Sequence, residues 1–397
     1  RVNSLAHRTT WLRSDLMLSK KRAFLYGVLL VMITALVTFN VDIVLGDKVV
    51  ISKETYDTYK KYNKLLGLEE LVKDDFYQKV DDTKIVDGAI KGMFYGLDDP
   101  YSQYYTQEEF KKLKEQTSGS FVGIGVYINP ISDDEYITIK SPVKGSPAEK
   151  AGILSGDKIL KVDGKVVTSE NSDEAISMIK GKEGTTVELT IKRNDKVFDV
   201  NVKREKIVTD TVEYKTLEDS IGYIKISSFA ENTYDEFKLA LDGLKDIKGL
   251  IIDVRDNPGG LLNVCKDIVD DLIGEGTIVY TKNNKGETEY LKSDKDKIDV
   301  PIVVLTNESS ASASEILTGA IIDNNAGISV GTTTFGKGLV QTVRELKDGT
   351  GYKLTTAQYY TPSGNYINEK GIKPTIEESN EEKQLQVAID WIKEQNK

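Results

Sequence analysis

The chain has 397 residues, a net charge of −10 and 39% hydrophobic residues, which is enough for two or three domains with apolar cores. The negative charge gives no reason to expect nucleic acid as a partner. Cys265 is the only cysteine and His7 the only histidine. An internal disulfide, a Cys-based metal cluster and a His-based catalytic triad or metal site are therefore excluded, unless His7 itself reaches the active site.

An uncharged apolar run, Ala23 to Phe39, follows a segment rich in Lys and Arg. Such a run approaches the roughly 20 residues that span a bilayer, and flanking basic residues stay on the cytoplasmic side. We therefore predict a cytoplasmic segment over 1–22, a transmembrane anchor over 23–45 and an extracytoplasmic location for the remaining domains. A cleaved signal peptide and a buried helix are the alternatives.

Apolar residues recur at near-helical spacing between residues 52 and 95, which predicts amphipathic helices in an N-terminal helical region over 50–117. A second such segment, 381–396, predicts a terminal helix within 376–397, with Leu385, Ala388, Ile389 and Ile392 on one side. These two helical regions suggest self-association, and we expect a homodimer.

Residues 118–206 predict a compact β-rich domain, and the stretch SPAEKAGILSGDKILKVDG within it resembles a PDZ domain of the circularly permuted kind found in bacterial proteases. The resemblance implies that a peptide adds to the edge of the sheet along 126–128, beside a helix over 172–179. Its terminal carboxylate would bind N–H groups of the loop formed by Val122, Gly123, Ile124 and Gly125. The alternative is that the two glycines only form a turn or bulge.

Residues 207–375 alternate short apolar strands with helices, which predicts a layered α/β domain. Strands are expected over 221–226, 249–254 and 300–305, with a helix over 232–244 between the first two. The charged segment 281–297 predicts an exposed hairpin.

A strand, a serine-rich turn and the start of a helix follow one another between Pro301 and Ile322. Such a junction exposes a side-chain oxygen beside free backbone N–H groups, which suits a nucleophile and an oxyanion. Because no histidine is at hand, the base would be a lysine whose pKa is lowered by burial. Lys337, between two glycines in apolar sequence, is the best candidate; the alternative is a turn lysine that points to water.

Six motifs then occur in one order: GLDDPYSQYY, the PDZ stretch, DVRDNPGG, SASASEI, FGKGLVQ and YYTPSG with KGIKP. From about Gly92 to its end the chain resembles the carboxyl-terminal processing proteases, serine peptidases with a ClpP/crotonase-like fold. The resemblance implies that Ser312 is the nucleophile, that Lys337 is the general base and that Gln341 orients the lysine. It also implies an oxyanion hole made by the N–H of Ala313 and by one N–H from Gly259 or Gly260.

Two features of the sequence compete with these roles. Ser312 and Glu315 have the spacing of a capping box, so the serine hydroxyl could simply cap its helix. Lys337 and Gln341 are four residues apart, roughly 13 Å in a straight strand. Direct contact between these two side chains therefore requires the chain to bend after Gly336.

The sequence thus predicts a multidomain α/β protein, a membrane-anchored extracytoplasmic serine endopeptidase that cleaves polypeptides near their C-termini. The PDZ domain would bind substrate C-termini and gate access to the site. No metal, nucleotide or nicotinamide cofactor is implied. One alternative is a non-catalytic adaptor that holds peptide C-termini on a protease-like scaffold. Another is a crotonase-like acyl-transfer enzyme that uses DNPGG as its oxyanion hole.

Overall fold

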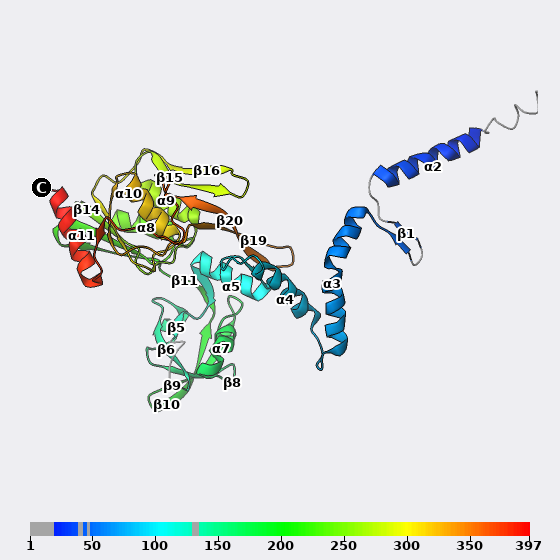
Figure 1. The fold of residues 1–397 in the computed structure, drawn as a ribbon. Helices are drawn as coiled ribbons and strands as arrows, with labels where there is room; N and C mark the ends of the chain where they lie inside the picture. Colours follow the sequence, from blue (N-terminus) through cyan, green and yellow to red (C-terminus); the bar gives the residue numbers. More distant parts are fainter. Residues whose placement is uncertain (1–19, 39–42, 46–47, 129–134) are drawn as a thin grey trace, which may run out of the picture. The chain divides into compact units, whose positions relative to one another are not determined.

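A computed structural model describes residues 20–38, 43–45, 48–128 and 135–397 (Figure 1). The chain divides into two units, with the boundary in the sequence between Ala89 and Ile90. The first unit contains helix α2 (Lys20–Thr38), the antiparallel hairpin of β1 (Ile43–Leu45) and β2 (Lys48–Val50), helix α3 (Lys53–Asp75) and the start of α4 (Asp82–Tyr95). Ser52 caps α3 by accepting a hydrogen bond from the N–H of Thr55 at 3.0 Å. Neither α3 nor α4 buries a residue.

The transmembrane anchor predicted over 23–45 is not found. The helix in this region, α2, starts with the three basic residues Lys20, Lys21 and Arg22 and ends at Thr38. Among the helices that the structure describes, none is both long and apolar enough to cross a membrane.

The second unit begins with the end of α4, β3 (Gln103–Tyr105) and α5 (Gln107–Ser118), and continues into a small antiparallel sheet in the order β10-β9-β7-β6-β5. Its strands are β5 (Val126–Ile128), β6 (Ile137–Pro142), β7 (Lys158–Val162), β9 (Thr186–Arg193) and β10 (Lys196–Lys203), with β8 (Lys165–Val166) beside β7. The helices are α6 (Pro147–Lys150), η1 (Ser169–Asn171) and α7 (Ser172–Ile179).

This small domain has a core of its own. Alternate residues of β9, namely Val187, Leu189 and Ile191, are fully buried, as expected for a strand with one face on a core. The domain is entered through β4 (Ser120–Gly123) and left through β11 (Glu205–Val208), which pair with each other in antiparallel fashion. The predicted strand over 126–128 and helix over 172–179 coincide with β5 and α7.

A six-stranded sheet in the order β12-β13-β14-β17-β18-β21 forms the centre of the larger domain. Every neighbouring pair from β13 to β21 is parallel, and only β12 runs antiparallel to its neighbour. The strands are β12 (Val212–Leu217), β13 (Ile221–Ile226), β14 (Gly249–Asp253), β17 (Ile302–Thr306), β18 (Gly327–Gly331) and β21 (Ile376–Glu377), with the turn η2 (Glu218–Ser220) between the first two.

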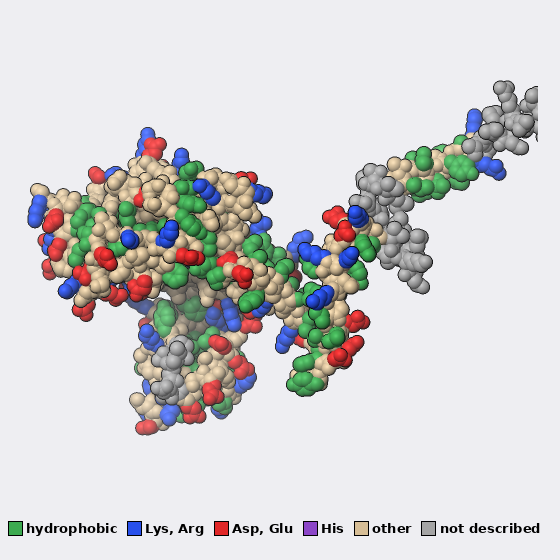
Figure 2. Space-filling view, in the orientation of Figure 1, with side chains coloured by type: hydrophobic (Ala, Val, Ile, Leu, Met, Phe, Trp, Pro, Cys, Tyr) green, Lys and Arg blue, Asp and Glu red, His purple; other side chains and the backbone are tan. Residues whose placement is uncertain are grey.

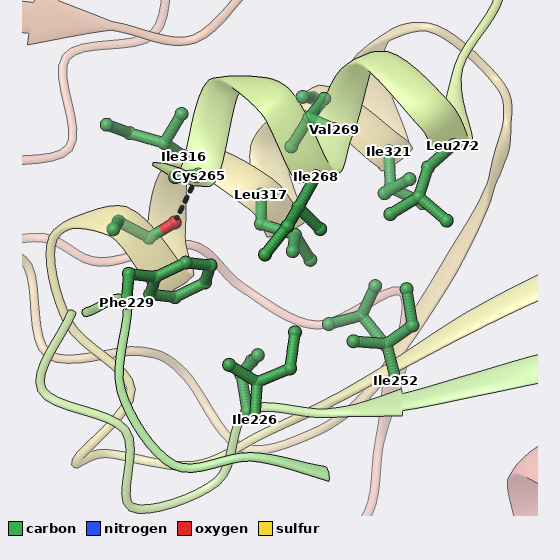
Figure 3. Packing of buried hydrophobic residues seen from close by; sticks show 14 of the residues in the cluster. Ile226, Phe229, Ile252, Cys265, Ile268, Val269, Leu272, Ile316, Leu317 and Ile321 are labelled. Atoms are coloured by element: carbon green, nitrogen blue, oxygen red, sulfur yellow. Dashed lines mark hydrogen bonds between the residues drawn. The ribbon is translucent and has the colours of Figure 1, made fainter. Parts of the chain in front are cut away.

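Helices cover both faces of this sheet. Side chains such as Ile252 pack in one cluster with α8 (Thr233–Gly243), α9 (Leu262–Leu272) and α10 (Ala313–Asp323), whereas the adjacent Ile251 packs with α11 (Glu381–Gln395) on the other face. Figure 3 shows the first cluster, where the Cys265 thiol of α9 donates a hydrogen bond to the Ala313 carbonyl at 3.1 Å. The α9 and α10 helices are thereby fixed to each other at the point where α10 begins.

A second, antiparallel sheet has the order β16-β15-β20-β19, with β3 on the outer part of β20. Its strands are β15 (Gly276–Asn283), β16 (Thr288–Ser293), β19 (Leu339–Glu345) and β20 (Gly351–Tyr360). The hairpin of β15 and β16 confirms the hairpin predicted over 281–297, although it starts earlier. Because β19 begins two residues after Lys337, this sheet fixes the segment that carries the predicted base.

Candidate active site

Three loops that follow adjacent parallel strands meet at one edge of the central sheet. β17 pairs with β14 on one side and with β18 on the other. Gly259 and Gly260 follow β14, Ser312 follows β17, and Lys337 follows β18. In open α/β sheets, ligand sites lie beyond the carboxyl ends of the strands. The fold therefore gathers the predicted nucleophile, base and oxyanion-hole glycines at the edge where such sites are found.

The serines of the turn before α10 have different environments. The hydroxyl of Ser310 is fully buried and donates to the Val254 carbonyl at 2.8 Å. The hydroxyl of Ser314 is also buried and donates to the Asn257 carbonyl at 2.9 Å. These two serines bind the turn to the loop after β14. Ser312 is only partly buried, so its hydroxyl is available for chemistry.

Ser312 occupies the N-cap position of α10 in an unusual backbone conformation, with φ 54° and ψ −111°. A residue other than glycine rarely adopts a positive φ, and such strain is concentrated at functional sites. Ser312 and Glu315 are arranged as a capping box, but the Glu315 N–H donates to the Ser312 carbonyl at 2.9 Å. The Ser312 side chain makes no cap hydrogen bond, so capping does not occupy the predicted nucleophile.

Glu315 joins the serine turn to the lysine segment. Its carboxylate is fully buried. One oxygen, Oε2, accepts hydrogen bonds from the N–H groups of Ser312 and Lys337, both at 2.8 Å. The other, Oε1, accepts from the N–H of Gly336 at 2.7 Å and from the hydroxyl of Thr334 at 2.6 Å. A buried carboxylate with four donors is well satisfied, and it holds the two segments together.

The buried Tyr359 makes a second link between the same two residues. Its hydroxyl donates, in a shared hydrogen bond, to the backbone oxygens of Ser312 at 3.2 Å and of Lys337. Burial raises the pKa of Tyr359 well above its usual value, so the hydroxyl remains a neutral donor. Within the described part of the chain, no hydrogen bond joins the Lys337 Nζ to the Ser312 Oγ. The two backbones are thus held to common partners, while the two reactive atoms are not bonded to each other.

The Lys337 side chain is partly buried and its Nζ lies 4.6 Å from the centre of the Tyr101 ring. Burial is the main cause that lowers the pKa of Lys337 from its usual value, and the positive charge of Lys353 lowers it further. The negative charges of Glu315 and Asp99 act in the opposite direction. A lysine with a lowered pKa supplies a neutral amine more readily, as a general base requires.

Among the hydrogen bonds of the described residues, none joins Gln341 to Lys337. Its side-chain amide donates to the Leu339 carbonyl at 3.2 Å and to the hydroxyl of Thr355 at 3.4 Å. The expected direct orientation of the lysine by this glutamine is therefore absent from the hydrogen bonds of the described residues. β19 runs as a strand from Leu339, and its register with β20 shifts between Val340 and Gln341.

The glycine loop after β14 leaves space beside Ser312. A Cβ atom on Gly259 would lie 2.9 Å from the Ser312 Cβ and 3.0 Å from the Ala313 nitrogen, so only glycine leaves this space open. The N–H of Gly259 is already bound to the Asn257 Oδ1 at 2.8 Å. Among the hydrogen bonds of the described residues, none uses the N–H of Gly260 or of Ala313. Of the two predicted alternatives, Gly260 is therefore the one with a free donor.

The predicted carboxylate-binding loop lies between two strands of the small β domain. Val122 and Gly123 end β4, and Ile124 and Gly125 connect it to β5. A Cβ atom on Gly125, which has φ 78°, would lie 2.4 Å from the Ser146 Cβ, so the loop needs glycine there. In the described part of the chain the N–H groups of Ile124 and Gly125 have no hydrogen-bond acceptor, which leaves them available to a carboxylate.

Comparisons with known proteins identify the family. A family model described as peptidase family S41 matches residues 220–378, one for a PDZ domain matches 138–193, and one described as the activating protease CtpB N-terminal domain matches 42–109. The chain is 42% identical over 354 residues to the carboxy-terminal processing protease CtpA of Bacillus subtilis (strain 168), across 87% of this chain and 76% of that protein. The chain belongs to the carboxy-terminal processing serine proteases of family S41. The family predicted from the ordered motifs is thereby confirmed.

Two further proteins are similar to this chain. The chain is 41% identical over 355 residues to a probable CtpA-like serine protease of Staphylococcus aureus (strain COL), across 87% of this chain and 70% of that one. Among solved structures, the photosystem II D1 C-terminal processing protease is similar, with 28% identity, coverage of 82% of this chain and 92% of that one, and a TM-score of 0.48.

Sequence reasoning missed three side chains of this site: Glu315, Tyr359 and Tyr101. Glu315 was noticed only as the partner of Ser312 in a capping box. A charged residue inside an otherwise apolar helix is a signal that it has buried partners. The two tyrosines lie in the quoted motifs GLDDPYSQYY and YYTPSG, but nothing in the spacing indicates which tyrosine of each motif faces the lysine.

Proposed function

We propose that this S41 protease cleaves polypeptides near their C-termini by a Ser–Lys mechanism, with Ser312 as nucleophile and Lys337 as general base. The observation that carries the proposal is the double link between these residues. The Glu315 carboxylate binds the N–H groups of both, and the Tyr359 hydroxyl binds the carbonyls of both. These shared partners support the proposal, because they hold the backbones of the two residues to common groups.

The reaction proceeds in two halves. The Lys337 amine takes the proton of the Ser312 hydroxyl, and the serine oxygen attacks the peptide carbonyl. The tetrahedral intermediate breaks its C–N bond, and the leaving amine receives the proton from the lysine. Water then attacks the acyl-enzyme ester with the same lysine as base, and the product carboxylate leaves with Ser312 restored.

The N–H groups of Ala313 and Gly260 are proposed to bind the oxyanion of each tetrahedral intermediate. Both are free of other hydrogen bonds in the described residues, and the space beside them is kept open by Gly259. Backbone donors of this kind stabilise negative charge that develops in the transition state. Gly259 contributes room rather than a hydrogen bond.

The PDZ domain is proposed to bind the substrate's terminal carboxylate on the free N–H groups of Ile124 and Gly125, with the peptide extending along β5. Its coupling to the protease is supported by Lys180, the C-cap residue of α7. The Lys180 amine forms an ion pair with Glu115 of α5 at 2.6 Å and lies 5.2 Å from the Phe121 ring centre. A bound peptide that moves α7 would thus also displace the contact of Lys180 with α5, outside the PDZ domain.

The mechanism is tested by turnover of casein by the wild type, Ser312→Ala and Lys337→Ala. Both variants should lose activity, and a fluorophosphonate probe should label the wild type but not Ser312→Ala. Ser309→Ala and Lys370→Ala are matched controls, because both side chains are exposed near the same segments. Undiminished cleavage by Ser312→Ala or by Lys337→Ala would refute the Ser–Lys assignment.

An extracytoplasmic location and membrane anchoring rest on the sequence, where the apolar run Ala23–Phe39 follows a basic segment. We propose this location for the catalytic domains, against the finding that no described helix is long and apolar enough to span a bilayer. Digestion of intact cells with an external protease is the measurement. Catalytic domains that remain intact until the cells are broken would contradict the proposal.

We also propose that the chain forms a homodimer through α3. Large apolar side chains are exposed along this helix, as Figure 2 shows, and they include Tyr59, Leu65, Leu68 and Leu71. Such a surface is costly to leave in water and typical of an interaction site. Light scattering during gel filtration should give the mass of a dimer, and Leu68→Glu should yield a monomer. A wild-type monomer at micromolar concentration would refute this proposal.

A further inference from the structure

The turn between α4 and β3 is held in shape by Asp99. One carboxylate oxygen accepts from the N–H of Tyr101 at 3.1 Å, and the other accepts from the hydroxyl of Ser102 at 2.5 Å. Asp98, the preceding residue, has a positive φ of 51°. A turn with these internal hydrogen bonds presents the Tyr101 side chain in a defined direction.

The same turn is anchored to the sheet that follows Lys337. The N–H of Thr355 in β20 donates to the Ser102 Oγ at 2.9 Å, and β3 pairs with β20 directly afterwards. The hydroxyl of Thr355 also accepts from the Gln341 amide at 3.4 Å. Gln341 and the turn are therefore joined through Thr355, which lies between them.

Tyr101 contacts the Lys337 amine through the face of its ring, 4.6 Å from ring centre to Nζ. The turn, including Tyr101, lines a cleft of about 710 Å³ together with Gly336 and apolar residues such as Leu339 and Leu354. Water filling this cleft would have direct access to the lysine on this side if the ring were absent. The ring therefore lies where bulk water would otherwise solvate the amine.

We propose that Tyr101 is a positioning residue for the Ser–Lys reaction, with a ring that covers the Lys337 amine and keeps bulk water away from it. The inference rests on the proposed roles of Ser312 and Lys337. It assigns the GLDDPYSQYY segment, which lies more than two hundred residues before the catalytic lysine in the chain, to the active site. Asp99 and Ser102 serve this role indirectly, because they hold the turn that presents the ring.

The charges around the amine determine the direction of the expected effect. Lys353 of β20, Glu315 of α10 and Asp99 of the turn face Lys337, and burial is the main cause of its lowered pKa. An aromatic face attracts an ammonium group and so favours the protonated lysine. Burial acts the opposite way and is the main cause of the lowered pKa, so we expect exposure of the amine to raise its pKa.

The test is the pH dependence of kcat for casein cleavage by Tyr101 variants of the full chain. Tyr101→Phe and Tyr101→Leu keep an apolar side chain over the amine. The acidic limb of their kcat–pH profiles should therefore coincide with that of the wild type. Tyr101→Ala opens the site, so its acidic limb should move up by about one pH unit, which is roughly a tenfold loss at neutral pH that recovers in alkali. A variant that was merely less well folded would lose activity at every pH.

Tyr101→Gln is the second open variant, because its polar side chain admits water without leaving a large void; it should shift the limb as Tyr101→Ala does. If Tyr101→Ala and Tyr101→Gln are folded and the acidic limbs of their kcat–pH profiles do not shift, the inference is overturned. So would a Phe variant shifted as far as the Ala variant, since the hydroxyl would then be responsible. If Ser312→Ala or Lys337→Ala retains activity, the proposed function itself has failed; if both are inactive and the limbs do not move, only the role of Tyr101 has failed.

Discussion

Two helices of this protease, α10 and α3, differ strongly in solvent exposure. Nine of the eleven residues of α10 are buried, including a glutamate. None of the 23 residues of α3 is buried, although the helix contains several leucines. The first helix supports the active site and is constrained on all sides by the sheet and by α9. The second buries no residue, and beyond its cap and its own hydrogen bonds it is joined to α4 by the ion pair of Lys73 with Asp82 at 3.1 Å. Substitutions in the two helices should therefore have very different consequences.

The largest effect is expected from Glu315→Gln. Both carboxylate oxygens of Glu315 accept from backbone N–H groups, so an amide NH₂ in either orientation would face a donor. We expect casein turnover to fall by at least about 100-fold and the free energy of unfolding to fall by about 2–5 kcal/mol. Urea unfolding and initial rates measure these effects.

Glu308→Gln is the matched control, since Glu308 is an exposed glutamate in the same turn and accepts from the Thr332 hydroxyl at 3.2 Å. It should change neither quantity appreciably. If Glu315→Gln and Glu308→Gln change casein turnover and the free energy of unfolding equally, burial of Glu315 in α10 does not determine its effect.

Gly259→Ala should reduce activity more than stability. The added Cβ would lie 2.7 Å from the Ala311 carbonyl and 3.0 Å from the Ala313 nitrogen, at a φ of 100°. It would intrude where the oxyanion is expected, so kcat should fall by about 100- to 1,000-fold. Gly274→Ala is the control, because its Cβ would meet only the Lys297 Cδ at 3.6 Å. Full activity of Gly259→Ala would place the oxyanion elsewhere.

Leu317→Ala and Leu68→Ala compare the two helices directly by the same change. Leu317 in α10 is fully buried, and its truncation should cost about 2–5 kcal/mol of unfolding free energy. Leu68 in α3 is 49% exposed, and the same truncation should cost no more than about 0.5 kcal/mol. Thermal or urea unfolding of each variant gives the comparison. A large loss at Leu68 would show that α3 is covered by something in solution, as a dimer would provide.

The smallest effect is expected from Lys353→Met. The positive charge of Lys353 lowers the pKa of Lys337, so its removal should raise that pKa and move the acidic limb of kcat upward. A decrease of about twofold at neutral pH is expected, and it should diminish in high salt because exposed charges are screened. Lys60→Met in α3 is the control. An acidic limb of kcat that moves to lower pH would show that Lys353 does not lower the pKa of Lys337.

Much of the fold was predictable because its signals are local. The alternation of β9, the limits of β5 and α7, and the helix over 381–396, found as Glu381–Gln395, all follow from residues that are neighbours in the sequence. Ser312 and Lys337 were predicted from the order of the motifs, and their catalytic roles stay predictions. The transmembrane anchor predicted over 23–45 is not found among the described helices, and it stays a prediction.

The missing parts of the site depend on contacts between distant segments. Glu315 binds groups that lie 19 to 22 residues further along the chain, and spacing in the sequence does not reveal such contacts. The interpretation of Gln341 as a direct partner of Lys337 came from the resemblance alone. Its actual partner, Thr355, is brought close by the pairing of β19 with β20.

The double link through Glu315 and Tyr359 has a consequence for how the enzyme can be switched. Since the backbones of Ser312 and Lys337 share these partners, neither loop can shift without disturbing the other. We expect engagement of the base to depend on the rotamer of the lysine side chain and not on the opening of a loop. Relaxation-dispersion NMR on these loops should then detect no microsecond-to-millisecond exchange, and pronounced exchange there would contradict this expectation.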